Sequence, residues 1–493
     1  MLLVSRYSHH IVVTQYNPQE EARLREFMGL YTQKTFHKNE EPKVFAASPP
    51  GEYRFHINQM PHLLHHLKNV GVTYRITNPP LYEPEAIDVA VRPQWVLRDY
   101  QKPVVEYLTA TDSNTKLVSA ATGTGKTFMA LNALSRIGKK VVIVILPTYI
   151  EKWAGDITSI LELDKKDVMV VQGSAQLKGL IELAKNGTHK SPFTIISSRT
   201  LQNFIMSYES QPTRVTLDEY GALPHELFPL LKAGVLLIDE THQHIHALFK
   251  MTLYTHVPKF IGLTATLLSD DYTVTKIHRI MYPPAIRMPE QGLEKYTDVY
   301  AIAYNTRSKV KLRTEEWGST NYSHNAYERS ILKYPFVLEN YLKILDNVIE
   351  IGYLQKYEKG DKLAIYASTV AMCDAIVEHL ERTYPQFDIR RYCEDDPYEN
   401  VIEPDIRVST IISSGTAIDI PNLRVVILTI SLSSSPANIQ VLGRLRKLEG
   451  KDTRFYYLYN ESIPKHVLYH QKKIELFKPR VRSHVTLKSP YAL

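Results

Sequence analysis

The chain has 493 residues, which is too long for one hydrophobic core and suits two or three domains of ordinary size. Hydrophobic residues make up 44% and charged residues 23%, which excludes a disordered or fibrous protein. The excess of 59 Lys and Arg over 52 Asp and Glu permits a polyanionic partner without requiring one.

Cysteine content and apolar runs predict the compartment. Cys373 and Cys393 cannot build a disulfide framework and lie in no CxxC pattern, so we expect a reducing cytoplasm. The first ten residues lack the charged region and apolar core of a secretory signal. The strongest apolar run, 141–146, is too short to span a bilayer. We therefore expect a cytoplasmic protein without a membrane partner, and a monomer.

Residues 1–90 predict a small α+β domain. After a short strand, a helix begins near Pro18, and four of its apolar residues recur at i, i+3, i+4 and i+7. Two strand-like stretches flank a second helix, and a Pro-rich linker ends the domain. The expected elements are strand 11–13, the helix with Leu24, Phe27, Met28 and Tyr31, strands 53–57 and 72–77, helix 61–69 and linker 78–86.

From residue 91 apolar β runs alternate with helical stretches, which is typical of a parallel sheet covered by helices. The pattern predicts a first α/β lobe over 91–285, a polar crossover over 286–335, and a second lobe over 336–493 with a basic, solvated tail. The expected strands are 116–120, 141–146, 193–197, 235–239 and 260–264 in the first lobe, and 362–368, 406–411, 424–430 and 454–459 in the second.

A phosphate-binding loop follows the first of these strands. In AATGTGKT (120–127), Gly123 and Gly125 let backbone N–H groups turn inward around a phosphate, and the next helix adds its positive end. Lys126 would meet the β- and γ-phosphates of ATP, and Thr127 would ligate Mg²⁺. Ala121, Thr122 and Thr124 complete the loop. The alternative is a Gly-rich turn that only caps a helix.

A carboxylate pair follows a later strand of the same lobe. VLLIDETH (235–242) places Asp239 and Glu240 at a strand end, where ligands of α/β sheets bind. Asp239 can hold Mg²⁺, while Glu240 can orient and deprotonate the attacking water. The two motifs together predict an ATP hydrolase.

The order of AATGTGKT, DETH and TAT (264–266) resembles the motor signature of superfamily 2 helicases of the DExH type. The resemblance covers about residues 95–460 and implies two RecA-like lobes. LRDYQ (97–101) resembles the adenine-recognition element, which implies Gln101 on the base edge with Arg98 nearby. Residues implied to couple phosphate state to lobe movement are His242, Thr264 and Thr266.

The second lobe resembles the same family over 366–376, 409–421 and 440–447. The resemblance implies nucleotide contacts from Gly415 and Asp419, a catalytic Gln440, and Arg444 as the arginine finger. Two positions depart from the family pattern. Ala417 stands where Gly is usual, and Lys447 replaces the last Arg, so either Arg446 or Lys447 could serve as the second finger.

Strand-end loops of such motors grip the sugar-phosphate backbone, so their contacts are expected to be independent of sequence and sensitive to salt. The resemblance implies Thr148, Arg199, Ser368 and Thr410 as nucleic-acid contacts. The alternative for each is an ordinary polar loop residue.

The layout also resembles phage recombination helicases of the UvsW type. That resemblance implies remodelling of forked and junction DNA in replication, recombination and repair, in the host cytoplasm if the protein is viral. The sequence shows no nuclease or methyltransferase motif, which disfavours a restriction-enzyme motor subunit.

Three alternatives stay open from sequence. The segment SGTAIDIP (414–421) also resembles that of poxviral transcript-release helicases, which implies an RNA-directed motor. The altered sixth motif would suit an ATP-gated clamp without productive turnover. The alternating histidines of HQHIH (242–246) and the run HLLHH (62–66) could hold a metal, although no cysteine stands nearby.

Overall fold

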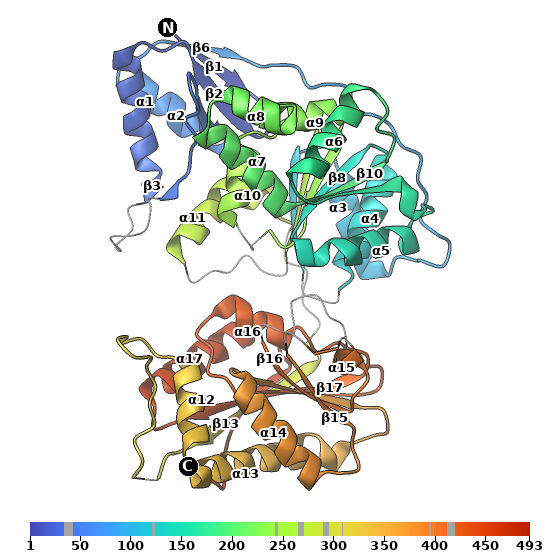
Figure 1. Cartoon of the computed structure of the whole chain (residues 1–493), viewed down its shortest axis with the longest axis vertical. Coiled ribbons are helices and arrows are strands. Elements are labelled where there is room, and N and C mark those ends of the chain that lie inside the picture. The colour runs from blue at the N-terminus through green and yellow to red at the C-terminus, as the bar shows by residue number, and fades with distance from the viewer. Residues whose placement is uncertain are drawn as a thin grey trace. The chain divides into compact units, whose positions relative to one another are not determined.

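The structure is a computed structural model that describes residues 1–33, 43–120, 124–241, 245–264, 271–288, 295–307, 309–393, 396–397, 399–411 and 420–493. The chain forms two compact units, Met1–Pro289 and Glu290–Leu493 (Figure 1). The first unit contains both the predicted N-terminal domain and the predicted first lobe.

A four-stranded sheet with two helices opens the first unit. Its order is β5-β2-β1-β6, with β1 antiparallel to β2 and parallel to β6. Helix α1 begins with a capping box in which the Asn17 side chain accepts from the backbone of Glu20 and the Glu20 carboxylate accepts from Asn17 N. The elements are β1 (Leu2–Arg6), β2 (His10–Thr14), α1 (Pro18–Leu30), β3 (Thr32–Gln33), β4 (Lys43–Val44), β5 (Tyr53–His56), α2 (Met60–Asn69) and β6 (Tyr74–Thr77).

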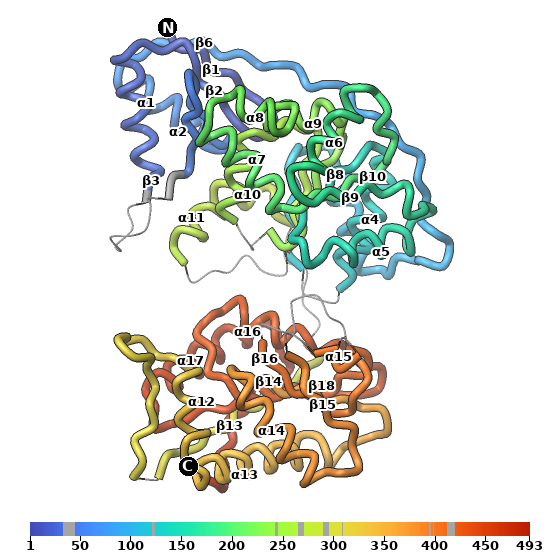
Figure 2. The backbone as a smooth tube through the Cα atoms, viewed as in Figure 1, coloured from blue at the N-terminus to red at the C-terminus, as the bar shows by residue number. Residues whose placement is uncertain are grey.

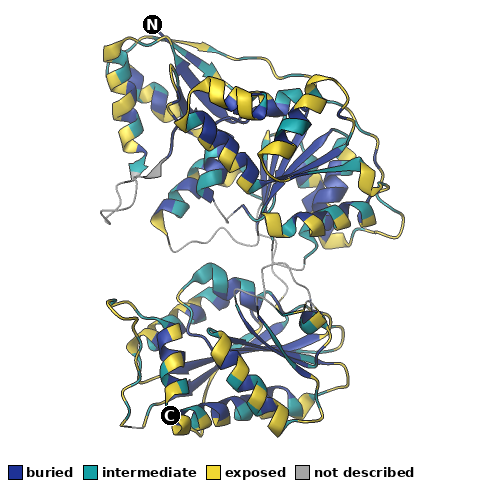
Figure 3. Cartoon of the chain, in the orientation of Figure 1, coloured by how far each residue is buried: buried dark blue, intermediate teal, exposed yellow. Residues whose placement is uncertain are grey.

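The rest of the first unit is a six-stranded parallel sheet covered by helices. Its order is β7-β12-β11-β8-β10-β9, and its strands form a dark, buried layer in Figure 3. The strands are β7 (Thr115–Ser119), β8 (Val141–Ile145), β9 (Val168–Val171), β10 (Phe193–Ser197), β11 (Val235–Ile238) and β12 (Lys259–Thr264). The helices are α3 (Lys102–Thr109), α4 (Lys126–Ile137), α5 (Ile150–Ile160), α6 (Ser174–Lys185), α7 (Ser198–Ser210), α8 (Thr213–Tyr220), α9 (Leu227–Leu230), α10 (Ile245–Thr252) and α11 (Tyr272–Met281).

The small sheet and the large sheet share one hydrophobic core. Side chains of the N-terminal domain, among them Phe27 and Phe55, belong to the same buried cluster as residues of α7, α10 and β12. Hydrogen bonds also cross the seam, by which we mean the contact between the N-terminal domain and the first lobe. Arg54 Nη1 donates to the Leu253 carbonyl at 3.1 Å, and Val257 N donates to Ser8 Oγ at 3.0 Å. The seam therefore joins the N-terminal domain to the segment between α10 and β12.

An extended segment, 78–98, links β6 to the region before α3. It runs along the outside of the first unit (Figure 2). Backbone bonds hold it in place, from Glu85 N to the Lys232 carbonyl and from Arg92 N to the Ile160 carbonyl, at 3.0 and 2.8 Å. The predicted linker 78–86 is thus bonded along part of its length to the lobe surface.

The second unit is built on a seven-stranded parallel sheet of order β15-β16-β14-β17-β18-β13-β19. The strands are β13 (Thr297–Tyr304), β14 (Lys362–Ala367), β15 (Ile389–Tyr392), β16 (Ile406–Thr410), β17 (Leu423–Leu428), β18 (Thr453–Asn460) and β19 (Ser483–Lys488). The helices are α12 (His324–Lys333), α13 (Pro335–Gly352), α14 (Val370–Thr383), α15 (Glu399–Ile402), α16 (Ser435–Leu442) and α17 (Pro464–Phe477).

Two predicted irregular segments contain strands of this sheet. Strand β13 lies inside the predicted crossover 286–335 and pairs with β18 along its whole length. Strand β19 lies inside the basic tail, which we expected to be a solvated end, and it pairs with β13 as the sheet edge. Most of β19 is exposed, and an edge strand of this kind carries little apolar signal in its sequence.

The predicted fold class is confirmed: two parallel-sheet α/β lobes with a RecA-like fold follow a small α+β N-terminal sheet. No helix within the described ranges is long and apolar enough to cross a membrane.

Candidate nucleotide and nucleic-acid site

The carboxyl ends of β7, β12 and β11 lie side by side and carry the predicted motifs. Since β12 lies between the other two strands, its last residues connect them: Ala120 N donates to the Thr264 carbonyl at 3.0 Å, and Thr241 N donates to the Leu263 carbonyl at 3.0 Å. Parallel α/β sheets bind ligands at this edge. Thr264, the predicted coupling residue, thus connects the start of the phosphate loop with the central strands.

Helix α4 begins directly at Lys126, after Gly125 has taken a left-handed conformation with φ 86°. A helix of this length presents free N–H groups and a positive dipole end at its start, which suits an anionic phosphate. The Lys126 ammonium donates to the Ala120 carbonyl at 3.0 Å, across the mouth of the loop. Thr127 is the second residue of α4 and is half-buried.

The adenine-recognition element is bonded to the phosphate loop. Gln101 is buried, and its Nε2 donates to the Thr124 carbonyl at 3.0 Å while its Oε1 accepts from Arg98 N at 3.0 Å. A Cβ on Gly125 would lie 2.6 Å from the same Nε2. A side chain at position 125 would therefore have to displace the Gln101 amide from the phosphate loop and adopt a left-handed backbone.

The carboxylates follow β11 at the middle of the sheet. Glu240 N donates to Asp239 Oδ1 at 2.9 Å, and Glu240 has a positive φ of 49°, a strained conformation that is common at functional sites. Burial raises the pKa of the Asp239 carboxyl and the adjacent Glu240 charge raises it further, while Lys126 and a bond from Trp153 oppose the shift. A cation near Asp239 would relieve this negative charge.

These residues fit Mg²⁺. Magnesium at a nucleotide is held by one or two carboxylates together with phosphate oxygens, and seldom by a cage made only of protein. Asp239 offers a half-buried carboxylate, and Thr127 offers a hydroxyl at the start of α4. In the part of the chain that the structure describes, no group of three or more His, Cys, Asp or Glu forms a metal cage.

The Trp153 contact was missed from sequence. The indole Nε1 of Trp153, on α5, donates to Asp239 Oδ2 at 2.9 Å. Its spacing with Ile150, Ile157 and Ile160 predicts only an apolar helical face, because periodicity carries no information on where an indole N–H points.

The nucleic-acid residues predicted in the first lobe are surface residues at strand ends. Thr148 follows β8 in a short 3₁₀ turn and is exposed, and Arg199 is exposed in the first turn of α7. Next to Arg199, Thr200 Oγ1 is buried and accepts from Gly173 N at 2.8 Å.

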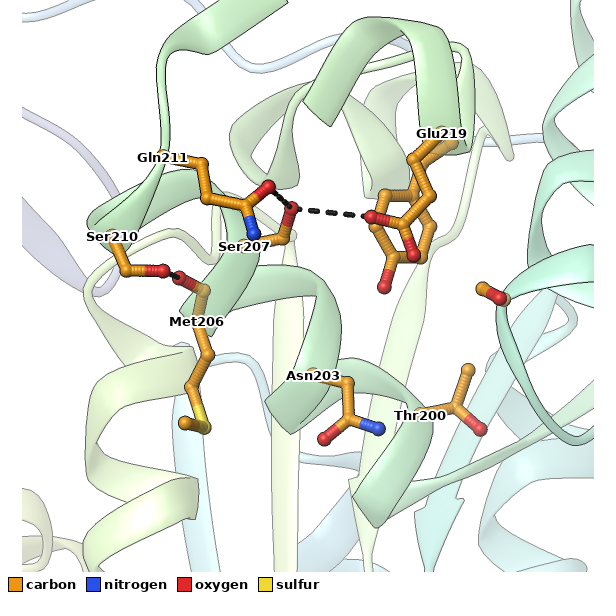
Figure 4. Close-up of a pocket in the computed structure, with 9 residues that line it drawn as sticks. Thr200, Asn203, Met206, Ser207, Ser210, Gln211 and Glu219 are labelled. Carbon is orange, nitrogen blue, oxygen red and sulfur yellow. Dashed lines mark hydrogen bonds between the residues drawn. The ribbon is translucent and has the colours of Figure 1, made fainter. Parts of the chain in front are cut away.

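Thr200 also lines a polar pocket of ≈ 350 Å³ formed by α7, α8 and the start of α6. Figure 4 shows the residues that line it. The Ser207 hydroxyl at its side can donate its one proton to Glu219 Oε2 at 3.4 Å or to Gln211 Oε1 at 3.5 Å. Several of its polar groups therefore already bind one another, and no sequence motif marked this pocket.

In the second unit, Ser368 and Thr410 follow or end neighbouring strands, β14 and β16. Glu328 of α12 fixes the loop after β14, because its carboxylate accepts from Ser368 N at 2.7 Å and from Thr369 N at 2.8 Å. Burial raises the pKa of Glu328 to about 7. Thr410 is buried at the end of its strand.

The predicted finger lies just after α16. Gln440 is half-buried in the last turn of this helix, and Arg444 is buried in the loop that follows. Arg446 Nη1 donates to the Gly443 carbonyl, whereas Lys447 is exposed. The choice between the two for a second finger stays a prediction.

Several predicted residues lie outside the described residues: Ala121, Thr122, Gly123, His242, Thr266, Gly415 and Asp419. The same holds for His244, so the HQHIH cluster is described only from His246, which stacks on Phe45 at 6.4 Å between ring centroids. The HLLHH histidines bind separate groups: His62 contacts the Tyr31 hydroxyl, His65 contacts Asn69, and His66 contacts the Arg23 carbonyl.

Part of the chain is similar to known proteins. Residues 94–269 match the family described as type III restriction enzyme, res subunit. Curated relatives include two proteins named DNA 3'-5' helicase XPB. The one from Kineococcus radiotolerans is 24% identical over 214 residues, which are 43% of this chain and 33% of that protein. The one from Mycobacterium tuberculosis is 24% identical over 201 residues, 41% of this chain and 32% of that protein.

The match therefore spans about a third of the length of these curated relatives. A solved structure of a Saccharomyces cerevisiae Dbp5 variant bound to Gle1 aligns with a TM-score of 0.51 at 9% identity, over 80% of this chain and 89% of that chain. It shows a shared fold. The chain is therefore similar over part of its sequence to proteins named DNA 3'-5' helicases, and similar in fold to Dbp5.

Proposed function

We propose that the protein is an ATP-dependent DNA helicase or translocase that unwinds or branch-migrates forked and junction DNA. One observation carries the ATPase part: the phosphate loop before α4 and the Asp239–Glu240 pair after β11 meet at one edge of a parallel sheet, connected through the end of β12. Both motifs lie in the segment that matches the family described as type III restriction enzyme, res subunit.

The site residues have distinct roles in this proposal. Lys126 and the start of α4 bind the β- and γ-phosphates, Gln101 and Arg98 bind the base, and Glu240 orients and deprotonates the attacking water. Asp239 and Thr127 would hold Mg²⁺, which when bound supplies charge neutralisation at the phosphates. Arg444 and Gln440 act on the γ-phosphate from the second lobe, with Gly415 and Asp419 as further nucleotide contacts.

Residues in the loops next to the nucleotide site are assigned to energy coupling and to DNA contact. We assign coupling to His242, Thr264 and Thr266, and DNA backbone contacts to Thr148, Arg199, Ser368 and Thr410. The Thr264 carbonyl already accepts from the first residue of the phosphate loop, so a movement of that loop reaches β12 directly. Backbone contacts of this kind make binding dependent on salt rather than on sequence.

The choice of DNA and of direction rests on the relatives, both of which are named DNA 3'-5' helicases. We extend to this chain both the DNA substrate and the 3'-to-5' direction. The preference for branched DNA rests on the resemblance to UvsW-type helicases and on the N-terminal domain. A DNA-binding role for that domain, in a monomeric cytoplasmic protein, completes the proposal.

The test is ATP turnover with no nucleic acid, single-stranded DNA, linear duplex, a four-way DNA junction and RNA, at one fixed salt concentration. The proposal expects the largest stimulation by the junction, and strand separation only on duplexes with a 3' overhang. Stimulation mainly by RNA would replace the DNA motor with an RNA-directed one. Negligible turnover with DNA, together with DNA binding tightened by ATP, would instead identify a clamp.

A further inference from the structure

The segment between β13 and α12, residues 305–323, lies in the second unit, and its backbone can be followed in Figure 2. It contains one exposed large apolar side chain and several exposed basic ones. Trp317 in this segment is 91% exposed, the highest exposure of any large apolar side chain in the described part of the chain. Four cations precede it in the same segment, Arg307, Lys309, Lys311 and Arg313, and all four are exposed. Within the described ranges, none of the four pairs with a carboxylate.

Lys309, Lys311 and Arg313 lie on the outward side of the chain. They recur at every second position, and exposure alternates along 309–315, where Val310, Leu312 and Thr314 are half-buried between exposed neighbours. Successive residues of an extended chain point to opposite sides, so every second residue lies on the same side, about 6.6 Å apart along the backbone. Leu312 packs against the core of the unit and so fixes which side faces outward.

Trp317 is held by an ordered hairpin. Glu315 and Tyr322 form an antiparallel bridge, and Ser319 N donates to the Glu316 carbonyl at 3.1 Å. Gly318 has a φ of 78°, which the third position of a type II turn requires, so Trp317 occupies the second position at the tip. Below the tip, the Glu316 carboxylate accepts from Ser323 Oγ at 2.8 Å and pairs with Arg329.

The base of this hairpin adjoins a predicted nucleic-acid loop. Ser323 caps α12, and two residues later the Asn325 side chain accepts from the Ser368 hydroxyl. Glu328, one turn further along α12, holds the backbone of Ser368 and Thr369. Because all strands of this sheet are parallel, the hairpin after β13 and the loop after β14 leave the same edge.

We propose that the hairpin 315–322 and the cations at 307, 309, 311 and 313 form a second nucleic-acid contact, in which Trp317 stacks on an unpaired base and the cations track the phosphates. Base stacking on an exposed aromatic ring next to a basic track is how proteins bind single strands without sequence preference. The inference rests on the proposed function and adds to it a place where an unpaired strand is held.

The test measures the binding of fluorescently labelled 20-nucleotide DNA and RNA single strands to the full-length chain by anisotropy, over a series of salt concentrations. Trp317→Ala is expected to raise Kd about 5-fold or more without changing the salt dependence, whereas Trp317→Phe retains most of the affinity. Lys309→Ala combined with Lys311→Ala is expected to flatten the slope of log Kd against log salt by about 1.4, since each phosphate contact on a single strand contributes about 0.7.

Matched controls lie elsewhere in the same unit. Phe336→Ala removes an aromatic ring that is 47% exposed on α13, and Lys343→Ala with Arg382→Ala removes two exposed cations from α13 and α14. Both controls are expected to bind like the wild type. If Trp317→Ala binds as tightly as the wild type, or if its loss equals that of Phe336→Ala, the inference is overturned.

The same preparations separate this inference from the proposed function. ATP turnover of the wild type with and without DNA reports the motor, so an unstimulated wild type that binds no strand overturns both proposals. A stimulated wild type whose affinity is unaffected by the Trp317 and lysine substitutions overturns only the second contact. Affinity lost for RNA and not for DNA would identify RNA as the strand held here.

Discussion

Trp153 and Asp239 are joined by a hydrogen bond of 2.9 Å, from the indole N–H of a tryptophan that is 1% exposed to one carboxylate oxygen of a predicted Mg²⁺ ligand. Trp153 lies on α5, the helix that follows the predicted nucleic-acid residue Thr148. The bond therefore connects a loop assigned to DNA with a residue assigned to the nucleotide.

Trp153→Phe tests this connection. The ring stays apolar, but Asp239 loses a donor that opposes the upward shift of its pKa, so that pKa rises further. Only the ionised carboxylate binds a cation, so the acid limb of ATP turnover should move to higher pH. The Mg²⁺ concentration for half-maximal turnover should rise about 10- to 100-fold, as for other residues that orient a metal ligand.

The control is Trp95→Phe, which also removes an indole N–H, in this case one that donates to the Ser159 carbonyl of the same helix at 2.9 Å. Its Mg²⁺ dependence and pH profile should match the wild type. Equal effects of the two substitutions would mean that Trp153 only packs the core.

Gly125→Ala should abolish nucleotide binding. A side chain there must adopt a left-handed backbone, and its Cβ would lie 2.6 Å from Gln101 Nε2, which would break the bond that ties Gln101 to the phosphate loop. Gly187→Ala places the same substitution at a φ of 68° where no heavy atom lies within 4 Å. Both variants should lose about 1–2 kcal/mol of stability, the cost of a left-handed backbone for an L-residue, and only Gly125→Ala should fail to bind a fluorescent ATP analogue.

Lys126→Ala and Glu240→Gln should both abolish ATP hydrolysis, for different reasons. Without Lys126 the β- and γ-phosphates lose their positive partner, so ATP binding weakens as well. Glu240→Gln keeps the shape of the side chain and removes the base, so ATP binding should persist. Turnover at the wild-type rate in either variant would contradict the assignment of the site.

Lys473 provides a prediction on stability in the second unit. It is 2% exposed on α17, and burial lowers its pKa to about 7. The folded chain releases this proton near pH 7, while the unfolded chain holds it up to the ordinary lysine range near pH 10.5. The unfolded state binds more protons between these values, so this residue makes the wild type more stable as pH rises from 7 toward 10.5.

Lys473→Met removes that dependence. The free energy of unfolding can be measured with urea at pH 7.5 and at pH 9.5. Between these values that of the wild type should increase by on the order of 2 kcal/mol relative to that of the variant. The variant should be the more stable protein at pH 7.5, because its folding does not require a side chain with an ordinary pKa of 10.5 to give up its proton. The adjacent Lys472 is exposed, so Lys472→Met should follow the wild-type pH profile and serves as the control.

The nucleotide site was largely predictable because its signals are local. The phosphate loop and the DETH segment each follow an apolar strand. Because the alternation of strands and helices predicts a parallel sheet, the carboxyl ends of both strands are expected at the same edge. Strands β13, β15 and β19 were missed for two different reasons. The β15 sequence IRRY and the mostly exposed β19 lie near or at sheet edges, where polar residues are tolerated, while β13 follows a Pro-bearing polar stretch that reads as a crossover.

Other contacts depend on partners that sequence periodicity does not specify. An apolar stripe on α5 predicts burial of Trp153, but the acceptor of its N–H comes from a residue 86 positions away. The basic residues at 307–313 read as part of a polar linker until their alternating exposure is seen.

The seam between the N-terminal domain and the first lobe has a practical consequence. Since Phe27 and Phe55 share a core with α10, a chain shortened to start near residue 91 would expose a large apolar surface on the lobe that binds the nucleotide. Such a truncation would remove stability and ATPase activity together, so it could not reveal what the N-terminal domain does with DNA. That role is accessible only through surface substitutions that leave the shared core closed, and proteases should cleave elsewhere before they separate the two parts.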